Sequence, residues 1–179
     1  LGHKQPANLT DEQRNQIRDI INKIASCMKF ENCPSHTELK VNDRGIFVIE
    51  TSPRLGGDYI TSTLTPLSTG INMEDQLLHI ALGEKVDITT GRIYKASAVC
   101  FFSLPEGVVT AIDSKINEVS SWPNVHSFLL KLHVGDKVNK ITSSLNRYGQ
   151  FIITGEDRKE IDDLVEKYEN EINKLIAIE

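Results

Sequence analysis

Hydrophobic residues recur at helical spacing in three stretches of the chain. Between residues 9 and 30 they fall on one face at intervals of three and four, which predicts an amphipathic helix. Thr10 and Gln13 have the T-x-x-Q spacing of a capping box and mark the start of this helix. The same periodicity predicts a shorter helix over residues 72–82 and a longer one over residues 156–175.

Strict alternation of polar and apolar residues marks a second kind of segment. Residues 36–52 alternate in two runs joined by a turn, which predicts a β-hairpin. If residues 43–45 form a three-residue loop ending in glycine, Glu38 lies directly opposite Glu50. The side chains expected on the same face as the two glutamates are His36, Lys40, Val48 and Ser52.

The remaining segments suggest a change of architecture near residue 92. Residues 53–70 are rich in Gly, Ser and Thr, and we predict a long loop there. Strand-like runs separated by Gly and Pro then follow. These runs are residues 94–102, 107–113, 127–134 and 150–154. We therefore predict two domains, residues 1–91 and residues 92–179.

Composition limits the class of protein. The chain has 179 residues, of which 39% are hydrophobic and 25% charged, as in an ordinary globular protein. Its net charge of −5 argues against broad nucleic-acid binding, and no apolar run approaches the roughly 20 residues that span a bilayer. We expect a cytoplasmic protein with no nucleic-acid or membrane partner and with reduced cysteines. Whether it forms a homodimer is left open.

The first residues suggest that the chain belongs to something longer. It begins at Leu1 without Met, and the following GHKQPAN resembles a loop after a strand. We therefore expect a fragment of a larger protein.

The hairpin carries the residues with chemical potential. Two carboxylates about 5 Å apart across a ladder repel each other unless a cation lies between them. Mg²⁺ suits this position, because it binds a few carboxylate oxygens and takes water or phosphate in its remaining positions. Arg54 and then Gly56-Gly57 follow Glu50, offering an oxyanion partner and backbone without side chains. A phosphate-handling site and a solvated hairpin with scattered charges both agree with this spacing.

A resemblance to a known family favours the phosphate-handling site. The run H-x-E-x(11)-E-x-S-P-R-x-G-G-D, residues 36–58, resembles the metal-binding strands of the ATP-grasp superfamily. The run S-T-G-I-N-M-E-D-Q and the helix after it resemble the segment that follows those strands, and GHKQPANLTDEQ resembles the segment before the preceding helix. The resemblance covers about residues 1–90. Within the superfamily, the chain most resembles the carboxylate–amine ligases that act on amino acids, namely L-amino-acid ligases and relatives of carbamoyl-phosphate synthase.

This resemblance implies a fold and a reaction. The expected fold class is α+β: the C-terminal half of an ATP-grasp fold, an antiparallel sheet with packed helices, followed by a small β-rich subdomain. The implied enzyme ligates a carboxylate to an amine, with amino acids as the expected substrates, through an acyl phosphate made from ATP. A carbamoyl-phosphate-synthase-like or biotin-carboxylase-like enzyme, and a non-catalytic binding module derived from the ATP-grasp fold, are the alternatives.

The resemblance also implies roles for individual residues. Glu38 and Glu50 would bind magnesium or manganese, with Ser52 in a third ligand position where the family usually has Asn. Arg54 would be catalytic, stabilising the transferred phosphoryl group. A hydroxyl is a weaker metal ligand than an amide oxygen, so Ser52 departs from the family pattern.

Other residues are implied to lie beside the substrate. Gly56 and Gly57 would contribute backbone there, and His3 matches a histidine that faces the substrate in the amino-acid ligases. The family's adenine-binding segment and phosphate-binding lysines lie upstream of the metal-binding strands. We therefore expect these 179 residues alone to be inactive.

Overall fold

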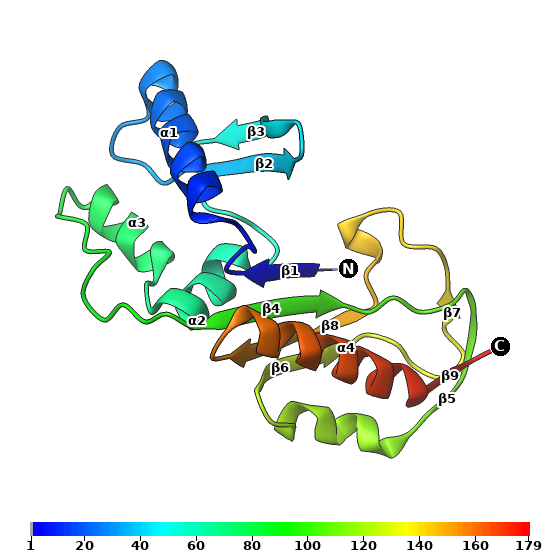
Figure 1. Cartoon of the computed structure of the whole chain (residues 1–179). Coiled ribbons are helices and arrows are strands. Elements are labelled where there is room, and N and C mark those ends of the chain that lie inside the picture. Colours follow the sequence, from blue (N-terminus) through cyan, green and yellow to red (C-terminus); the bar gives the residue numbers. More distant parts are fainter. Residues whose placement is uncertain (1) are drawn as a thin grey trace. The chain divides into compact units, whose positions relative to one another are not determined.

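The chain folds into two compact units, seen in a computed structural model that describes residues 2–179. One unit consists of residues 7–93 and is called the hairpin unit below. The other combines residues 2–6 with residues 94–179 and is called the sheet unit. Figure 1 shows the order of their elements. In sequence, the hairpin unit is therefore an insertion between the first strand of the sheet unit and the rest of it.

A four-stranded antiparallel sheet organises the sheet unit. Its strand order is β1-β4-β8-β6. The strands are β1 (Gly2–Gln5), β4 (Ala96–Phe101), β6 (Val125–Leu130) and β8 (Gly149–Gly155). Three of them lie within or overlap segments predicted as strands, whereas β1 lies in a segment that resembled a loop. That expectation was wrong because β1 pairs with β4, with His3 opposite Val99, and local sequence does not show so distant a ladder.

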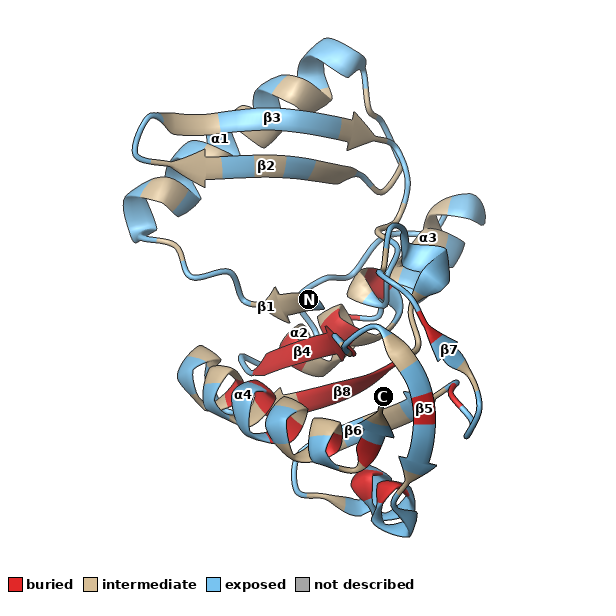
Figure 2. Cartoon of the chain, turned by 90° about the vertical axis from the view of Figure 1, so that its right-hand side faces the viewer, coloured by how far each residue is buried: buried red, intermediate tan, exposed pale blue. Residues whose placement is uncertain are grey.

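The helix α4 (Arg158–Lys174) covers one face of this sheet and closes the core. Its buried side chains follow the helical spacing of the predicted stripe. They are Ile161, Val165, Tyr168 and Ile172. On the strands, alternate residues such as Ala98 on β4 and Ile153 on β8 belong to the same buried cluster. Figure 2 shows the buried positions concentrated on β4, β8 and the inner side of α4.

A smaller three-stranded sheet completes this unit. Its strand order is β7-β5-β9. The elements are β5 (Gly107–Ile112), the 3₁₀ helix η2 (Ser114–Ser121), β7 (Lys137–Val138), the 3₁₀ turn η3 (Ser144–Asn146) and β9 (Ile176–Ile178). The sequence predicted β5 but neither β7 nor β9, which are too short to give an alternating pattern. The α+β class that we expected is confirmed by the antiparallel sheets and separate helices.

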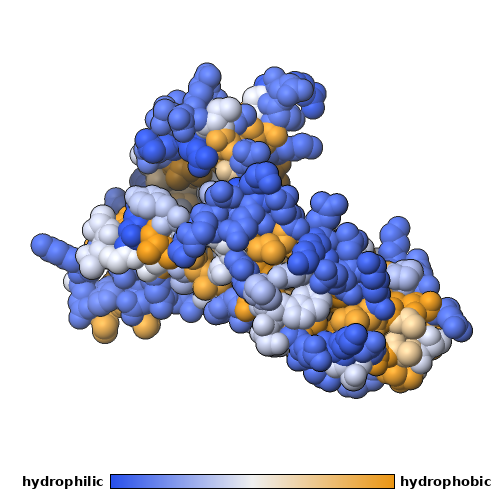
Figure 3. Space-filling view, turned by 60° about the horizontal axis from the view of Figure 1, so that its bottom comes forward, coloured by the Kyte–Doolittle hydropathy of each residue, from blue (hydrophilic) through white to orange (hydrophobic). Residues whose placement is uncertain are grey.

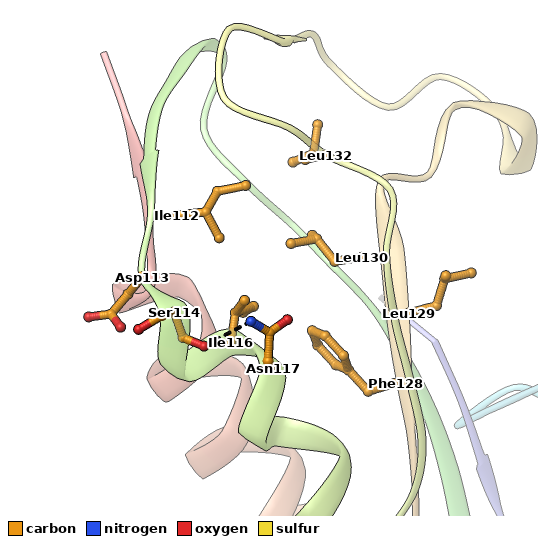
Figure 4. A pocket seen from close by; sticks show the side chains of 9 residues that line it. All are labelled: Ile112, Asp113, Ser114, Ile116, Asn117, Phe128, Leu129, Leu130 and Leu132. Atoms are coloured by element: carbon orange, nitrogen blue, oxygen red, sulfur yellow. Dashed lines mark hydrogen bonds between the residues drawn. The ribbon is translucent and has the colours of Figure 1, made fainter.

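A hollow of about 420 Å³ lies between η2 and β6 (Figure 4). Two of its three polar side chains, those of Asp113 and Asn117, already have local partners. Asp113 Oδ1 accepts a hydrogen bond from the backbone N–H of Lys115 at 2.9 Å, and Asn117 Nδ2 donates to the Ser114 carbonyl at 3.1 Å. Apart from Ser114, the rest of the lining is aliphatic or aromatic. The hollow therefore offers shape but little polar recognition.

The hairpin unit begins with helix α1 (Asp11–Met28), whose predicted capping box is confirmed. Thr10 Oγ1 accepts from the Gln13 N–H at 3.1 Å, and Gln13 Oε1 accepts from the Thr10 N–H at 2.9 Å. The hairpin of β2 (His36–Asn42) and β3 (Gly45–Ser52) follows. None of the residues in these three elements is buried (Figure 2).

The segment predicted as a long loop, residues 53–70, is partly helical, so that prediction was wrong. It contains the π-helical turn η1 (Ile60–Leu64) and the short helix α2 (Thr65–Thr69). Hydroxyl-rich sequence favours loops because the side chains compete for backbone hydrogen bonds. Here Thr65 Oγ1 donates to the Ile60 carbonyl at 2.9 Å, which supports the turn instead. Helix α3 (Met73–Ala81) then follows as predicted, with the Asn72 side chain as its cap.

Apolar side chains also reach the surface. On the face shown in Figure 3 they form patches separated by hydrophilic side chains. On the hairpin, Phe47, Val48 and Ile49 are 45%, 45% and 62% exposed. Of the helices described, none has both the length and the apolarity that crossing a bilayer requires.

An ionic cluster fastens β1 to α4 within the sheet unit. Lys4 pairs with Asp162, and Arg158 Nε lies 3.1 Å from Asp162 Oδ2. Arg158 also donates to the Pro6 carbonyl at 2.8 Å. The hydrogen bond from Lys4, followed by that from Arg158, holds the pKa of the Asp162 carboxyl below its usual value.

We predict that Asp162→Asn destabilises the sheet unit at neutral pH by less than about 1 kcal/mol, because the pair is partly exposed. Since the folded-state pKa is lowered, this stabilisation is present above the unfolded pKa of about 3.9 and is lost as the pH falls further. Chemical denaturation at pH 7 and pH 3 measures the difference. Asp163→Asn, which breaks only a surface pair with Lys159, is the control. A difference between Asp162→Asn and wild type that is as large at pH 3 as at pH 7 would contradict the prediction.

Candidate functional site

The register of the hairpin differs from the predicted one at the turn but agrees at the glutamates. Asn42 opposes Gly45, so the loop has two residues and not three. The Arg44 N–H donates to Asn42 Oδ1 at 2.9 Å, which favours this tighter turn. A bulge at Ile49 then supplies the extra residue in β3, so that Glu38 does lie opposite Glu50.

This bulge changes which side chains share a face. Val48 pairs with Leu39, and Phe47 takes the place opposite Lys40. The expectation that Val48 lies on the glutamate face was therefore wrong, because the extra residue is at Ile49 and not in the turn. Two adjacent cross-strand pairs remain together on that face: His36 with Ser52, and Glu38 with Glu50.

The opposite face of the hairpin is held by a different pair. The hydroxyls of Thr37 and Thr51 form a hydrogen bond of 2.9 Å. Because side chains alternate between faces, this bond lies away from the glutamates. It ties the two strands together one residue from His36 and one from Ser52.

Each glutamate has a basic group at its side. His36 Nε2 lies 3.7 Å from Glu38 Oε1, and Arg54 NH2 lies 3.7 Å from Glu50 Oε1. Arg54 also donates to the Leu55 carbonyl at 2.9 Å. Both carboxylates and Arg54 are at least half exposed, so an incoming phosphate could reach them.

The loop after β3 passes close to His36. The Gly56 N–H donates to Thr61 Oγ1 at 2.8 Å. A Cβ atom at Gly56 would lie 2.9 Å from His36 Nδ1 and 3.0 Å from Thr61 Oγ1, whereas one at Gly57 would meet nothing within 4 Å. Gly56 is therefore required by packing, while the backbone at Gly57 is open.

The carboxylate pair fits a metal ion that is shared with a substrate. Among residues 2–179, no three His, Cys, Asp or Glu side chains converge as a complete metal cage. Mg²⁺ is commonly held by one or two carboxylates together with water and substrate phosphates. Glu38 and Glu50, with the Ser52 hydroxyl on the same face, match that donor set.

His3 belongs to the sheet unit and not to the hairpin unit. It lies on β1, and its ring stands edge-on to Phe101 with 6.3 Å between ring centroids. The guanidinium carbon of Arg147 lies 3.7 Å above the centroid of the same ring. The side chains of His3 and Arg147 therefore both pack against the Phe101 ring.

The sequence analysis did not single out two residues near the site. His36 was placed on the glutamate face and in the H-x-E run, but it was given no role. Thr61 lay in the segment predicted as a loop. The contact of Thr61 with Gly56 depends on the π-helical turn, for which local sequence gives no signal.

His79 on α3 has a local role. Its Nδ1 lies 2.5 Å from Glu84 Oε2, and its Nε2 lies 3.6 Å from Asp75 Oδ2. The hydrogen bond with Glu84, aided by the charges of Asp75 and Glu84, raises the pKa of His79. The side chain ties the end of the helix to the segment that follows it.

Two sequence families match the chain. The model of the ATP-grasp domain matches residues 1–62, and that of the L-amino acid ligase C-terminal domain 2 matches residues 100–174. A Sinorhizobium fredii protein described as uncharacterized protein y4rH is 23% identical over 172 residues, which are 96% of this chain and 36% of that protein. The chain thus spans about a third of the length of this curated relative.

Solved structures share the fold. L-amino acid ligase from Bacillus licheniformis matches with a TM-score of 0.77 and 22% identity, over 99% of this chain and 43% of that one. Phosphoribosylglycinamide synthetase from Anaerococcus prevotii matches with a TM-score of 0.78 and 17% identity, over 100% of this chain and 45% of that one. The chain therefore corresponds to less than half of each protein.

We predict that Gly56→Ala and Gly57→Ala behave differently. Gly56→Ala forces a Cβ against His36 and Thr61 and should cost about 1–3 kcal/mol of unfolding free energy. Gly57→Ala meets open space and should be nearly neutral, which makes it a matched control. Chemical denaturation of both variants measures this, and equal effects would contradict the packing described here.

We also predict that the contribution of His79 to stability depends on pH. Because its folded-state pKa is raised, the stabilisation is fully present below the unfolded pKa of about 6.5 and is lost as the pH rises through the folded value. His79→Gln should therefore lower the denaturation midpoint more at pH 6 than at pH 9. His126→Gln, at an exposed position on β6, is the control. A His79→Gln effect that is independent of pH would contradict this prediction.

Proposed function

Because the family matches and the shared fold make this chain part of an ATP-grasp protein, we propose that it supplies the metal- and phosphate-handling half of an ATP-dependent carboxylate–amine ligase. The observation that carries the proposal is the Glu38–Glu50 cross-strand pair with Arg54 beside it. We assign residues 1–91 to the ATP-grasp domain and residues 92–179 to the C-terminal subdomain. We place the reaction in the cytoplasm, where ATP is available.

The proposed reaction has two steps. An oxygen of the substrate carboxylate attacks the γ-phosphorus of ATP, and the bond to the bridging oxygen breaks to release ADP. The amine nitrogen then attacks the acyl carbon of the acyl phosphate, the carbon–oxygen bond to the phosphate breaks, and the nitrogen loses a proton. We propose amino acids as both substrates, in keeping with the match to an L-amino acid ligase domain.

The hairpin residues have separate tasks in this scheme. Glu38 and Glu50 hold the divalent cation, Mg²⁺ or Mn²⁺, and Ser52 contributes a weaker oxygen. When bound, the cation neutralises charge on the phosphates of the nucleotide. A solved relative supports this use of metal and nucleotide. The biotin carboxylase domain of Hydrogenobacter thermophilus 2-oxoglutarate carboxylase, with a TM-score of 0.56 and 16% identity, was determined with MgADP and bicarbonate.

Arg54 binds the phosphoryl group during its transfer. Its guanidinium provides paired N–H groups for oxyanions and remains charged at any physiological pH. At 3.7 Å from Glu50 and half exposed, it can balance that carboxylate and still turn toward a phosphate. We assign Gly56 and Gly57 to substrate binding, where the open backbone at Gly57 allows close approach. His3, which belongs to the sheet unit, is assigned to substrate binding from the resemblance alone.

Ser52 favours a second candidate function. A hydroxyl in the third ligand position binds metal more weakly than the usual amide. Weak metal binding would suit a non-catalytic module that keeps the fold only for ligand binding. The intact set of Glu38, Glu50 and Arg54 favours the enzyme. A biotin-carboxylase-like or carbamoyl-phosphate-synthase-like enzyme is the alternative within the catalytic class.

We predict that Glu50→Gln in the full-length protein lowers turnover by about 10³-fold, because it removes a charge that holds the cation near the transferred phosphoryl group. ADP formation measured against Mg²⁺ concentration tests this. The full-length protein is used because we infer that these 179 residues alone are inactive. Glu74→Gln, at an exposed position on α3, is the control. Undiminished Mg²⁺-dependent turnover of Glu50→Gln would refute the proposed function.

A further inference from the structure

We propose that His36 is a positioning residue of this site, whose ring sets the spacing between the Glu38 carboxylate and the loop that carries Arg54. The effect on activity rests on the proposed function, whereas the packing it depends on does not.

His36 lies at the end of the hairpin where β3 ends and the following loop begins. His36 is the first residue of β2, and its cross-strand partner is Ser52, the last residue of β3. Its side chain is only 19% exposed, whereas that of Glu38 is 56% exposed. The ring is therefore largely covered while the carboxylate beside it stays open to solvent.

The two nitrogens of the ring face different parts of the site. Nε2 lies 3.7 Å from Glu38 Oε1, beside the carboxylate but beyond a hydrogen bond. Nδ1 would be 2.9 Å from a Cβ at Gly56, so the ring already occupies the space beside that glycine. His36 thus lies between a proposed metal ligand and the loop backbone.

Two hydrogen bonds hold the loop that packs against the ring. The Gly56 N–H bonds to Thr61 Oγ1 at 2.8 Å, and the Arg54 N–H bonds to the Ser52 carbonyl at 2.9 Å. Arg54 is therefore fixed between an anchored residue before it and an anchored glycine after it. Removing the ring would leave a gap under Gly56 and let both Arg54 and Glu38 move.

His36 acts by orientation and not as a ligand. Mg²⁺ is a hard cation that takes oxygen ligands, so the imidazole nitrogens are poor donors for it. Groups that orient metal ligands without touching the metal commonly affect metal affinity or activity by 10- to 100-fold. That is the size of effect expected here.

The test compares His36→Ala with His126→Ala in the full-length protein. His126 is an exposed histidine on β6 of the sheet unit, so the control removes the same side chain from the other unit. We expect His36→Ala to lower kcat by roughly 10- to 100-fold and to raise the Mg²⁺ concentration that gives half-maximal activity. His126→Ala should leave the Mg²⁺ dependence unchanged.

Several results would overturn the proposal. Wild-type kcat and Mg²⁺ dependence in His36→Ala would do so, as would an equal change in His126→Ala. If His36→Ala does not fold, His36→Asn carries the same test: it keeps a polar group but is too short to fill the gap, so the Mg²⁺ requirement should still rise. Glu50→Gln is measured in parallel. If turnover survives Glu50→Gln, the proposed function is refuted. If Glu50→Gln loses turnover while His36→Ala keeps the wild-type kcat and Mg²⁺ dependence, only the role of His36 is refuted.

A second measurement is independent of activity. Gly56→Ala should shift the denaturation midpoint less in a His36→Ala background than in wild type, because the ring that its Cβ would strike is gone. Additive shifts in this double-mutant cycle would show that the ring and the glycine do not contact each other and would overturn the proposal.

Discussion

The register of β2 against β3 is the constraint on which the candidate site depends. Side chains on a strand alternate between faces, so a slip of one residue would send Glu50 to the opposite side of the hairpin from Glu38. The tight turn at Asp43-Arg44 would cause such a slip if the ladder ran on regularly. The bulge at Ile49 restores the pairing, and bulges of this kind often lie next to functional sites. The hydrogen bond between Thr37 and Thr51 then holds the restored register.

That register places two negatively charged carboxylates directly opposite each other. Two carboxylates directly opposite each other destabilise a hairpin unless positive charge is supplied. Arg54 supplies positive charge beside Glu50, and the His36 ring lies beside Glu38, each 3.7 Å from the carboxylate oxygen. A divalent cation between the carboxylates would relieve the repulsion more completely, and phosphate would complete its coordination. The same arrangement that strains the hairpin therefore favours a ligand that brings both charges.

Local sequence was sufficient where structure depends on neighbours in the chain. The capping box at Thr10, the short helix within residues 72–82 and the buried stripe of α4 were all predicted correctly. Local sequence was not sufficient where contacts with distant segments determine the structure. β1 is a strand only because β4 accepts it, and the turn η1 forms in hydroxyl-rich sequence in which Leu64 is fully buried. The opposition of Glu38 and Glu50 was predicted through a wrong turn length, since the extra residue was placed in the loop when it belongs to the bulge.

The distribution of burial gives the two units different mechanical roles. The sheet unit holds the main hydrophobic core, with α4 packed on β4 and β8. In the hairpin unit, α1, β2 and β3 contain no buried residue. Local opening costs least where few apolar contacts must be broken, so the glutamate face lies on the part of the chain that opens most easily. A ligand that binds only the closed hairpin stabilises it in proportion to the logarithm of its concentration over its dissociation constant. In the proposed function, binding of metal and nucleotide would therefore stabilise the strands that hold them.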